Sequence, residues 1–231
     1  MRRTRAVIFD LDGTLSDSAP AIRRALNAVW RARGRPEASL ADVTGYIGDG
    51  PALLVVRARA ALGLAEDAAA VEAETGAFLD AYAKEGFGGE PYPDALSVLE
   101  RLAGAGLKLA VCTNKPQAAA ERMLAGLGFD RWLAGVVGGD AAPRRKPDPA
   151  HVRAALACLG GVDAADAVLV GDGPQDVDAG EAAGLDVIVA AYGYGGAAAL
   201  RPDLPTIPSI AALPAVLGLA PPVSAGQTGS K

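Results

Sequence analysis

The chain of 231 residues contains few cysteine, histidine and aromatic residues, and these low counts argue against an aromatic core, a disulfide and a catalytic histidine. Phe, Trp and Tyr make up only 5% of the residues while 51% are hydrophobic, so we expect a core of aliphatic side chains. The two cysteines, Cys112 and Cys158, stand in apolar stretches, which predicts buried free thiols in a reducing, cytoplasmic setting. The single histidine, His151, falls in the first turn of an expected helix, which favours a surface or structural role over catalysis.

The chain also lacks an excess of basic charge and any long apolar run. It has 22 Lys and Arg against 27 Asp and Glu, which argues against a nucleic-acid binder that uses a basic face. The apolar run before Asp10 is too short for a signal-peptide core, and no later run is long enough to span a membrane. We therefore expect neither a nucleic-acid partner nor a membrane, and a monomer or homodimer.

Short apolar runs alternate with helical patterns over much of the chain. The runs lack the polar alternation of a one-sided sheet, which is typical of strands covered on both faces. Strand after helix after strand predicts an α/β fold with a doubly wound, Rossmann-like parallel sheet. The expected strands are residues 6–9, 107–112, 135–137, 167–170 and 187–190, and the expected helices are residues 94–103, 117–127, 149–159 and 175–183.

One long segment after the first strand interrupts this alternation with helical patterns alone, at residues 19–33, 51–62 and 67–84. An all-helical block inserted into an α/β domain predicts a separate cap domain. The linkers, just after Leu15 and in the Gly- and Pro-rich stretch GFGGEPYP, are hinge-like and would let the cap open and close. We expect a core of residues 1–15 and 91–218, a cap of residues 16–90, and a disordered tail of residues 219–231.

The polar residues that follow the expected strands are candidates for chemistry, because a doubly wound sheet binds ligands beyond the carboxyl ends of its strands. Four strand ends deliver carboxylates, a hydroxyl, an amide and an ammonium group to one edge of the sheet. These residues are Asp10 and Asp12, then Thr113 and Asn114, then Lys146 in a longer loop, then Asp172 and Asp176.

Several carboxylates that converge on one place repel each other unless a cation lies among them. Mg²⁺ prefers oxygen ligands and favours a substrate phosphate, whose oxygens the lysine and the hydroxyl and amide groups would bind. One aspartate could then attack phosphorus to form an aspartyl-phosphate. A second aspartate two residues later points to the same side of an extended chain, and could protonate the leaving oxygen and then activate water. A plain turn at the strand end is the alternative for Asp10 and Asp12.

The segments DLDGT, TN, the lysine of KPDP and GDGPQD, in this order, resemble the motifs of the haloacid dehalogenase-like phosphatase superfamily. The resemblance covers about residues 6–217. It implies that Asp10 is the nucleophile and a metal ligand. It also implies that Asp12 is the general acid and base and binds metal through its carbonyl, and that Asp172 binds Mg²⁺.

The same resemblance assigns roles to the remaining candidates. Thr113 and Asn114 would bind the phosphate of a small phosphorylated metabolite. Lys146 would neutralise the nucleophile and the phosphate. Asp176 would orient Lys146 or a metal-bound water.

Within the superfamily, FDLDGTLSDSAP, YIGDG, TNKP, GGD followed by KPDP, and GYGYG look most like the phosphoglycolate phosphatase group. This likeness implies 2-phosphoglycolate as the substrate. However, Asp49 of YIGDG would repel a carboxylate-bearing substrate if its loop faces the site. Arg57 could either reach a substrate anion or face solvent.

Other activities remain as alternatives. A phosphatase for a sugar phosphate or pyrophosphate, or a sugar-phosphate mutase, would keep the metal and both aspartates. A haloacid dehalogenase needs neither a second acid nor a metal, so Asp12 and Asp172 argue against it. A phospho-accepting signalling module has no cap, so the helical insert argues against that class.

Overall fold

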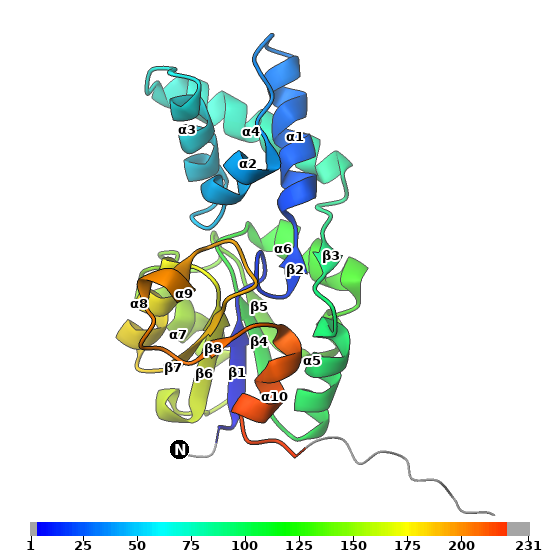
Figure 1. The fold of residues 1–231 in the computed structure, drawn as a ribbon, viewed down its shortest axis with the longest axis vertical. Coiled ribbons are helices and arrows are strands. Elements are labelled where there is room, and N and C mark those ends of the chain that lie inside the picture. Colours follow the sequence, from blue (N-terminus) through cyan, green and yellow to red (C-terminus); the bar gives the residue numbers. More distant parts are fainter. Residues whose placement is uncertain (1–3, 221–231) are drawn as a thin grey trace, which may run out of the picture.

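The computed structural model describes residues 4–220 and contains a six-stranded, fully parallel sheet in the order β5-β4-β1-β6-β7-β8 (Figure 1). The central strand β1 is completely buried, and its neighbours β4 and β6 pair with it along its full length. The predicted α/β class is therefore confirmed. The strands are β1 Ala6–Phe9, β4 Lys108–Cys112, β5 Leu133–Val137, β6 Ala167–Gly171, β7 Asp186–Ala190 and β8 Thr206–Ile207.

Helices cover both faces of the sheet, as the unbroken apolar strands require. Val7 and Phe9 of β1 belong to the core cluster that contains α5, α6 and α10, whereas Ala6 and Ile8 belong to the cluster with α7, α8 and α9. The helices are α5 Ala95–Gly104, α6 Gln117–Leu127, α7 Pro149–Ala157, α8 Pro174–Ala183, α9 Ala197–Leu200 and α10 Leu213–Val216, with short 3₁₀ turns at Asp130–Trp132, Ala164–Asp166 and Ile210–Ala212.

Two details of the core differ from the sequence prediction. The edge strand β8 was not expected, because two residues carry no readable periodicity. Cys112 is buried as expected, and burial raises the pKa of its thiol to about 12. The prediction that Cys158 is buried was wrong, because Cys158 comes directly after the last residue of α7 and is exposed there.

The helical insertion forms a cap above the carboxyl ends of the strands (Figure 1). Its own apolar core is built around Leu26, Trp30, Leu54 and Phe78. The expected helices are present, and α2 is an additional one. The cap helices are α1 Ala19–Arg31, α2 Leu40–Tyr46, α3 Pro51–Ala61 and α4 Ala68–Lys84.

The two linkers between core and cap pair with each other. Strand β2, Ser16–Asp17, runs antiparallel to β3, Glu90–Pro91, and the Ser16 hydroxyl donates to the Glu90 carbonyl at 2.9 Å. Gly89 lies close beside this pair: a Cβ atom there would lie 2.5 Å from Ser16 Oγ, so the Ser16 side chain would have to shift. The proposed boundaries between core and cap fall at this two-stranded hinge.

At the carboxyl end of the chain, residues 221–231 of the proposed tail lie outside the described range. Leu219 packs against the core, and Arg101 donates hydrogen bonds to the carbonyls of Leu219 and Ala220. Within residues 4–220, no helix combines the length and the apolar character needed to cross a membrane.

Candidate active site

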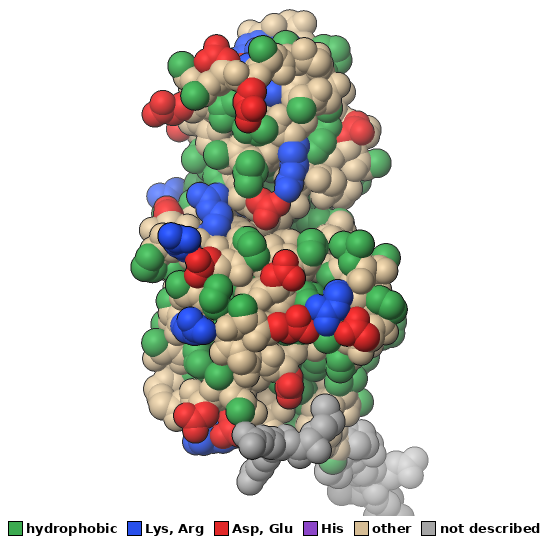
Figure 2. Space-filling model, turned by 90° about the vertical axis from the view of Figure 1, so that its left-hand side faces the viewer, with side chains coloured by type: hydrophobic (Ala, Val, Ile, Leu, Met, Phe, Trp, Pro, Cys, Tyr) green, Lys and Arg blue, Asp and Glu red, His purple; other side chains and the backbone are tan. Residues whose placement is uncertain are grey.

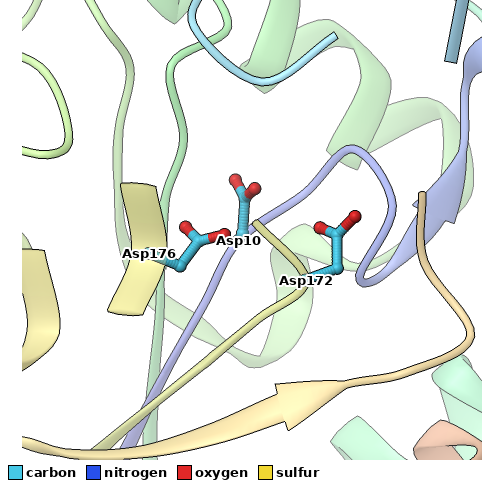
Figure 3. Close-up of side chains that lie close together, drawn as sticks. All are labelled: Asp10, Asp172 and Asp176. Atoms are coloured by element: carbon cyan, nitrogen blue, oxygen red, sulfur yellow. The ribbon is translucent and has the colours of Figure 1, made fainter. Parts of the chain in front are cut away.

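Asp10 and Asp12 follow the central strand β1, between the carboxyl ends of the neighbouring strands β4 and β6. Phe9 pairs with Val111 of β4 and with Val170 of β6, so Asp10 emerges level with the ends of both strands. The Asp10 backbone N–H donates to the Val170 carbonyl at 2.9 Å, which fixes the start of this loop. Parallel strands thus bring the predicted candidates to one sheet edge, as Figure 3 shows for three of them.

One group of charges is centred on Lys146, which lies in the loop between β5 and α7. Its Nζ is 2.9 Å from Asp10 Oδ1, 2.6 Å from Asp176 Oδ1 and 2.6 Å from the Cys112 carbonyl. The Lys146 and Asp176 side chains have no solvent exposure. We call Asp10, Lys146, Asp172 and Asp176 the Lys146 cluster. Burial alone would lower the pKa of Lys146, but the Asp10 and Asp176 carboxylates outweigh it, so Lys146 stays charged.

His151 fixes the loop that carries Lys146. The backbone N–H of Lys146 donates to His151 Nδ1 at 3.1 Å, while His151 Nε2 lies 3.2 Å and 3.1 Å from the carbonyls of Val137 and Gly138. Burial, with the charge of Lys146, lowers the pKa of His151 to about 4. The ring is therefore neutral with its hydrogen on Nε2, and its role is structural, as predicted, although it is fully buried.

Backbone and hydroxyl groups hold the remaining two aspartates. Asp172 accepts hydrogen bonds from the Gly195 N–H at 2.7 Å and from the Thr14 hydroxyl at 3.1 Å. Asp176 accepts from the Gly173 N–H at 3.0 Å. Gly13 of the DLDGT segment has a φ of +85°, and a Cβ atom there would lie 2.3 Å from Asp172 Oδ2. This position therefore requires glycine.

The three aspartates of the Lys146 cluster form a candidate metal site. One carboxylate oxygen from each of Asp10, Asp172 and Asp176 lies within 4.8 Å of the others, and all three residues are buried (Figure 3). Asp10 Oδ1, although ion-paired, makes no hydrogen bond to a described residue. Lys146 pairs with two of the three carboxylates, so negative charge is in surplus, and this all-oxygen donor set fits a hard divalent cation.

The electrostatics of these aspartates show the same surplus of negative charge. Burial raises the pKa of Asp10 to about 7, against the opposing effect of Lys146. Burial, followed by the charges of Asp10 and Asp176, raises the pKa of Asp172 well above its usual range. A bound cation would favour the ionised carboxylates.

A second group of charges surrounds Lys115, a residue that sequence reasoning did not select. Its Nζ donates to Asp12 Oδ1 at 2.9 Å, to Asp12 Oδ2 at 3.0 Å and to the Tyr82 hydroxyl at 3.0 Å. The Ser18 hydroxyl donates to Asp12 Oδ1 at 2.5 Å and lies 3.1 Å from the Tyr194 hydroxyl. We call these five residues the Lys115 cluster. The available signal was the position of Lys115 directly after the Thr–Asn pair that follows β4.

The Lys115 cluster joins the two domains. Asp12 and Lys115 belong to the core, whereas Tyr82 belongs to α4 of the cap. Burial would lower the pKa of Lys115, but the Asp12 carboxylate and the Tyr82 hydroxyl outweigh it, and the net shift is upward. Burial also raises the pKa of Tyr82, so the tyrosine remains neutral while Lys115 remains charged.

A pocket lies between the cap and the core, where the space-filling surface narrows (Figure 2). The cap contributes mainly apolar side chains, including those of Ile22, Ile47, Leu54, Phe78 and Leu79. On the face shown in Figure 2, acidic and basic side chains are interspersed. The core residues that line the pocket are Asp10, Asp12, Thr113, Asn114, Lys115 and Pro116.

Thr113 and Asn114 lie at the end of β4, where both are buried. The Thr113 hydroxyl accepts a hydrogen bond from the Lys115 N–H at 3.3 Å. The Asn114 amide donates at 2.9 Å both to the Gly48 carbonyl of the cap and to the Lys146 carbonyl. Asn114 therefore connects the cap loop with the loop of Lys146.

The cap loop YIGDG contacts the core through its backbone rather than through its carboxylate. Arg145 donates to the Asp49 carbonyl at 3.0 Å, while the Asp49 side chain forms an ion pair with Arg57. Arg57 also donates to the Tyr46 carbonyl at 3.0 Å. Neither Asp49 nor Arg57 lines the pocket. The Asp49 carboxylate is thus paired within the cap, and the Arg57 side chain is 38% exposed to solvent.

The strand-end carboxylates, the lysine loop and the inserted helical cap define the class of this protein. Residues 4–184 match the sequence profile of the haloacid dehalogenase-like hydrolases, so the chain belongs to that family. The family resemblance of the sequence motifs is thereby confirmed.

Individual relatives within this family show a more specific similarity. The chain is 47% identical over 195 residues to a phosphoglycolate phosphatase of Rhodospirillum rubrum, covering 82% of this chain and 80% of that protein. It is 42% identical to the plasmid-encoded phosphoglycolate phosphatase of Cupriavidus necator, covering 92% of each. The crystal structure of a predicted phosphoglycolate phosphatase from Haemophilus somnus superposes with a TM-score of 0.84 at 28% identity, covering 94% of this chain and 99% of that one.

Proposed function

We propose that this chain is a Mg²⁺-dependent phosphoglycolate phosphatase, which hydrolyses 2-phosphoglycolate to glycolate and phosphate through an aspartyl-phosphate. The observation that carries the proposal is the placement of Asp10 and Asp12 in the wall of one pocket, with Asp10 paired to Lys146. The proposed nucleophile and the proposed proton donor thus face the same pocket. The names of the two relatives that are 47% and 42% identical support the choice of substrate.

In the first step, a carboxylate oxygen of Asp10 attacks phosphorus as the bond from phosphorus to the glycolate oxygen breaks. Asp12 gives its proton to that oxygen, which leaves as the hydroxyl of glycolate. In the second step, Asp12 takes a proton from the water that attacks phosphorus. Inorganic phosphate then leaves, and the Asp10 carboxylate is restored.

The Lys146 ammonium reduces the repulsion between the Asp10 carboxylate and the incoming phosphate dianion. Asp176 lies 2.6 Å from Lys146 Nζ, so it orients the ammonium toward Asp10. Asp10, Asp172 and the Asp12 carbonyl would hold Mg²⁺. The ion would supply further neutralisation of charge on the phosphate oxygens.

The Thr113 and Asn114 side chains would bind the phosphate in different ways. The Thr113 hydroxyl accepts from the Lys115 N–H and donates to no other group among residues 4–220, so its hydrogen could bind a phosphate oxygen. The Asn114 amide already donates to two carbonyls. Its contact with phosphate therefore requires exchange of the bond to Gly48, which links substrate binding to movement of the cap loop.

The finer expectations on setting and assembly also belong to this proposal. We propose that the enzyme acts in the cytoplasm on a small phosphorylated metabolite, as a monomer or homodimer. Both cysteines are free thiols, which supports the reducing setting.

The proposed function is tested by phosphate release from a panel that contains 2-phosphoglycolate, glucose 6-phosphate, β-glucose 1-phosphate and pyrophosphate, with Mg²⁺ or with EDTA. We expect the highest kcat/KM for 2-phosphoglycolate, and loss of activity in EDTA that Mg²⁺ restores. A sugar phosphate or pyrophosphate as the best substrate would overturn the choice of substrate. Full activity in EDTA would overturn the metal requirement.

A further inference from the structure

The phosphate end of the substrate has several partners in this site, but its carboxylate also needs one. Among the described residues that line the pocket, Lys115 carries the one cationic side chain. The nearby Arg57 is paired with Asp49 outside the pocket lining, and Arg145 donates to a backbone carbonyl. If the proposed function holds, Lys115 is the group able to balance the second negative charge of 2-phosphoglycolate.

The hydrogen bonds of Lys115 are arranged so that one can be exchanged. Nζ donates to both oxygens of Asp12 and to the Tyr82 hydroxyl, which uses all three of its hydrogens. Asp12 therefore receives two of these bonds, and one of them can be given up while the other still joins Lys115 to Asp12. Ser18 donates to Asp12 Oδ1 in addition. An incoming carboxylate can take one N–H from Asp12 while Asp12 keeps Lys115 and Ser18 as partners.

The chemistry of the reaction places the substrate carboxylate near Lys115. Asp12 must reach the ester oxygen to protonate it, and in 2-phosphoglycolate one CH₂ group separates that oxygen from the carboxylate. A cation that is hydrogen-bonded to Asp12 therefore lies within reach of the carboxylate.

The surroundings of Lys115 strengthen such an ion pair. Its side chain is only 3% exposed, and Leu54, Phe78 and Ile22 of the cap line the same pocket. In this apolar space an ammonium–carboxylate pair is less screened than in water. The same apolar walls provide no hydrogen bonds for the hydroxyl groups of a sugar phosphate, which disfavours that class of substrate.

We propose that Lys115 binds the substrate carboxylate and thereby selects phosphate esters that carry a carboxylate next to the ester carbon. This assignment rests on the proposed function. Tyr82 supplies the cap side of the contact, so selection takes place when the cap covers the core.

The test compares kcat/KM for 2-phosphoglycolate with kcat/KM for 2-hydroxyethyl phosphate, which has the same chain length but no carboxylate. In Lys115→Met we expect activity on both substrates to fall, because Asp12 loses a partner. The preference for 2-phosphoglycolate should fall further, by roughly ten- to a hundredfold, the size expected for one hydrogen bond between charged groups. Lys115→Arg should recover part of the preference.

Lys108→Met is the matched control. Lys108 Nζ donates to the carbonyls of Leu159 and Gly160 at 2.7 Å and 3.0 Å. Lys108 is the first residue of β4, so it lies at the end of that strand opposite to the pocket. We expect its preference between the two substrates to equal that of the wild type.

Binding to the Mg²⁺-loaded protein provides a second measurement that does not depend on turnover. By titration calorimetry, Lys115→Met should weaken phosphonoacetate binding by at least about tenfold and ethylphosphonate binding by much less. Equal losses for the two ligands and the two substrates would overturn the proposal and leave Lys115 as a positioning residue for Asp12. A wild type without preference for 2-phosphoglycolate would overturn the proposed function as well. A wild-type preference that Lys115→Met retains would overturn the role of Lys115 alone.

Discussion

The Lys146 and Lys115 clusters each bury an ammonium group at the same edge of the sheet, but they are completed by different parts of the chain. Lys146 contacts Asp10, Asp176 and a core carbonyl, so the core alone assembles its cluster. Lys115 needs Tyr82 of the cap for its third hydrogen bond. The comparison separates two tasks: the proposed nucleophile is held by core residues alone, whereas the group proposed to select the substrate spans the interface between core and cap.

The two clusters also differ in how much depends on each lysine. Without Lys146, the buried carboxylates of Asp10 and Asp176 would lose their ammonium partner. Without Lys115, Asp12 would keep the Ser18 hydrogen bond, and its side chain is 13% exposed to water. The cost of removing the ammonium should therefore be larger in the Lys146 cluster.

The largest difference in stability is expected between Lys146→Met and Lys115→Met in metal-free protein. Lys146→Met should lower the free energy of unfolding by about 3 kcal/mol, because it leaves buried carboxylates without their partner. Lys115→Met should lower it by about 1 kcal/mol. Chemical denaturation measures both values. Equal losses would show that the two clusters are not distinct in this respect.

A pH effect of up to a few kcal/mol is expected from Asp10 of the Lys146 cluster. Its pKa is about 7 in the folded protein against an ordinary value of 3.8, so between these pH values the unfolded chain has already released the proton. The free energy of unfolding of the metal-free protein should therefore fall as the pH rises from about 4 to 7. Below this window Asp10 does not change that free energy, and above it the whole loss is present.

Mg²⁺ and a variant provide the controls for this pH effect. Mg²⁺ should stabilise the protein more at pH 8 than at pH 5, because it binds the ionised carboxylates. Asp10→Asn has no proton to release at this position, so its decline in stability over the same window should be smaller. A decline as steep in Asp10→Asn as in the wild type would assign the effect to other groups.

Tyr82→Phe tests the cap side of the Lys115 cluster with a smaller change. The ring would keep its stacking on Phe78 and its edge contact with Phe87, at centroid distances of 5.8 Å and 5.4 Å. Only the hydroxyl bonded to Lys115 Nζ and to the Gly88 carbonyl is lost. We expect kcat/KM for 2-phosphoglycolate to fall about fivefold, with little change in thermal stability. No change in kcat/KM would mean that turnover of 2-phosphoglycolate does not depend on this hydroxyl.

Asp49→Asn should have the smallest effect. Its carboxylate is paired with Arg57 within the cap, and both side chains are partly exposed, so the pair contributes at most about 1 kcal/mol to stability. We expect kcat/KM for 2-phosphoglycolate to stay within about twofold of the wild type. A clear gain in activity would instead indicate that the Asp49 charge acts on the substrate.

The fold and the Lys146 cluster were readable from the sequence for a common physical reason. The apolar run of β1 has no polar alternation because helices cover both faces, and parallel strands bring their carboxyl ends to one edge. Asp10, Lys146 and Asp172 could therefore be selected from their places after expected strands. Their detailed geometry, such as the His151 contact with the Lys146 backbone, follows from packing rather than from local pattern.

The features that sequence reasoning missed depend on contacts between distant segments or on very short elements. Helix α2 has a capping box in which Ser39 and Asp42 bond each other, but it buries only Val43 and so lacks an apolar stripe. The bond from Lys115 to Tyr82 joins the core to the cap, and nothing in either local pattern predicts it. The position of Lys115 beside Thr113 and Asn114 indicates a role in the site only once the cap residue that it contacts is known.

The most direct test of the central claim is the release of glycolate and phosphate from 2-phosphoglycolate by wild-type protein and by Asp10→Asn, both with Mg²⁺. We expect the wild type to release the two products in equal amounts. Asp10→Asn should be slower by more than about 10³-fold while its circular dichroism spectrum stays that of the folded protein. Hydrolysis by folded Asp10→Asn within about tenfold of the wild-type rate would contradict the assignment of Asp10 as the nucleophile.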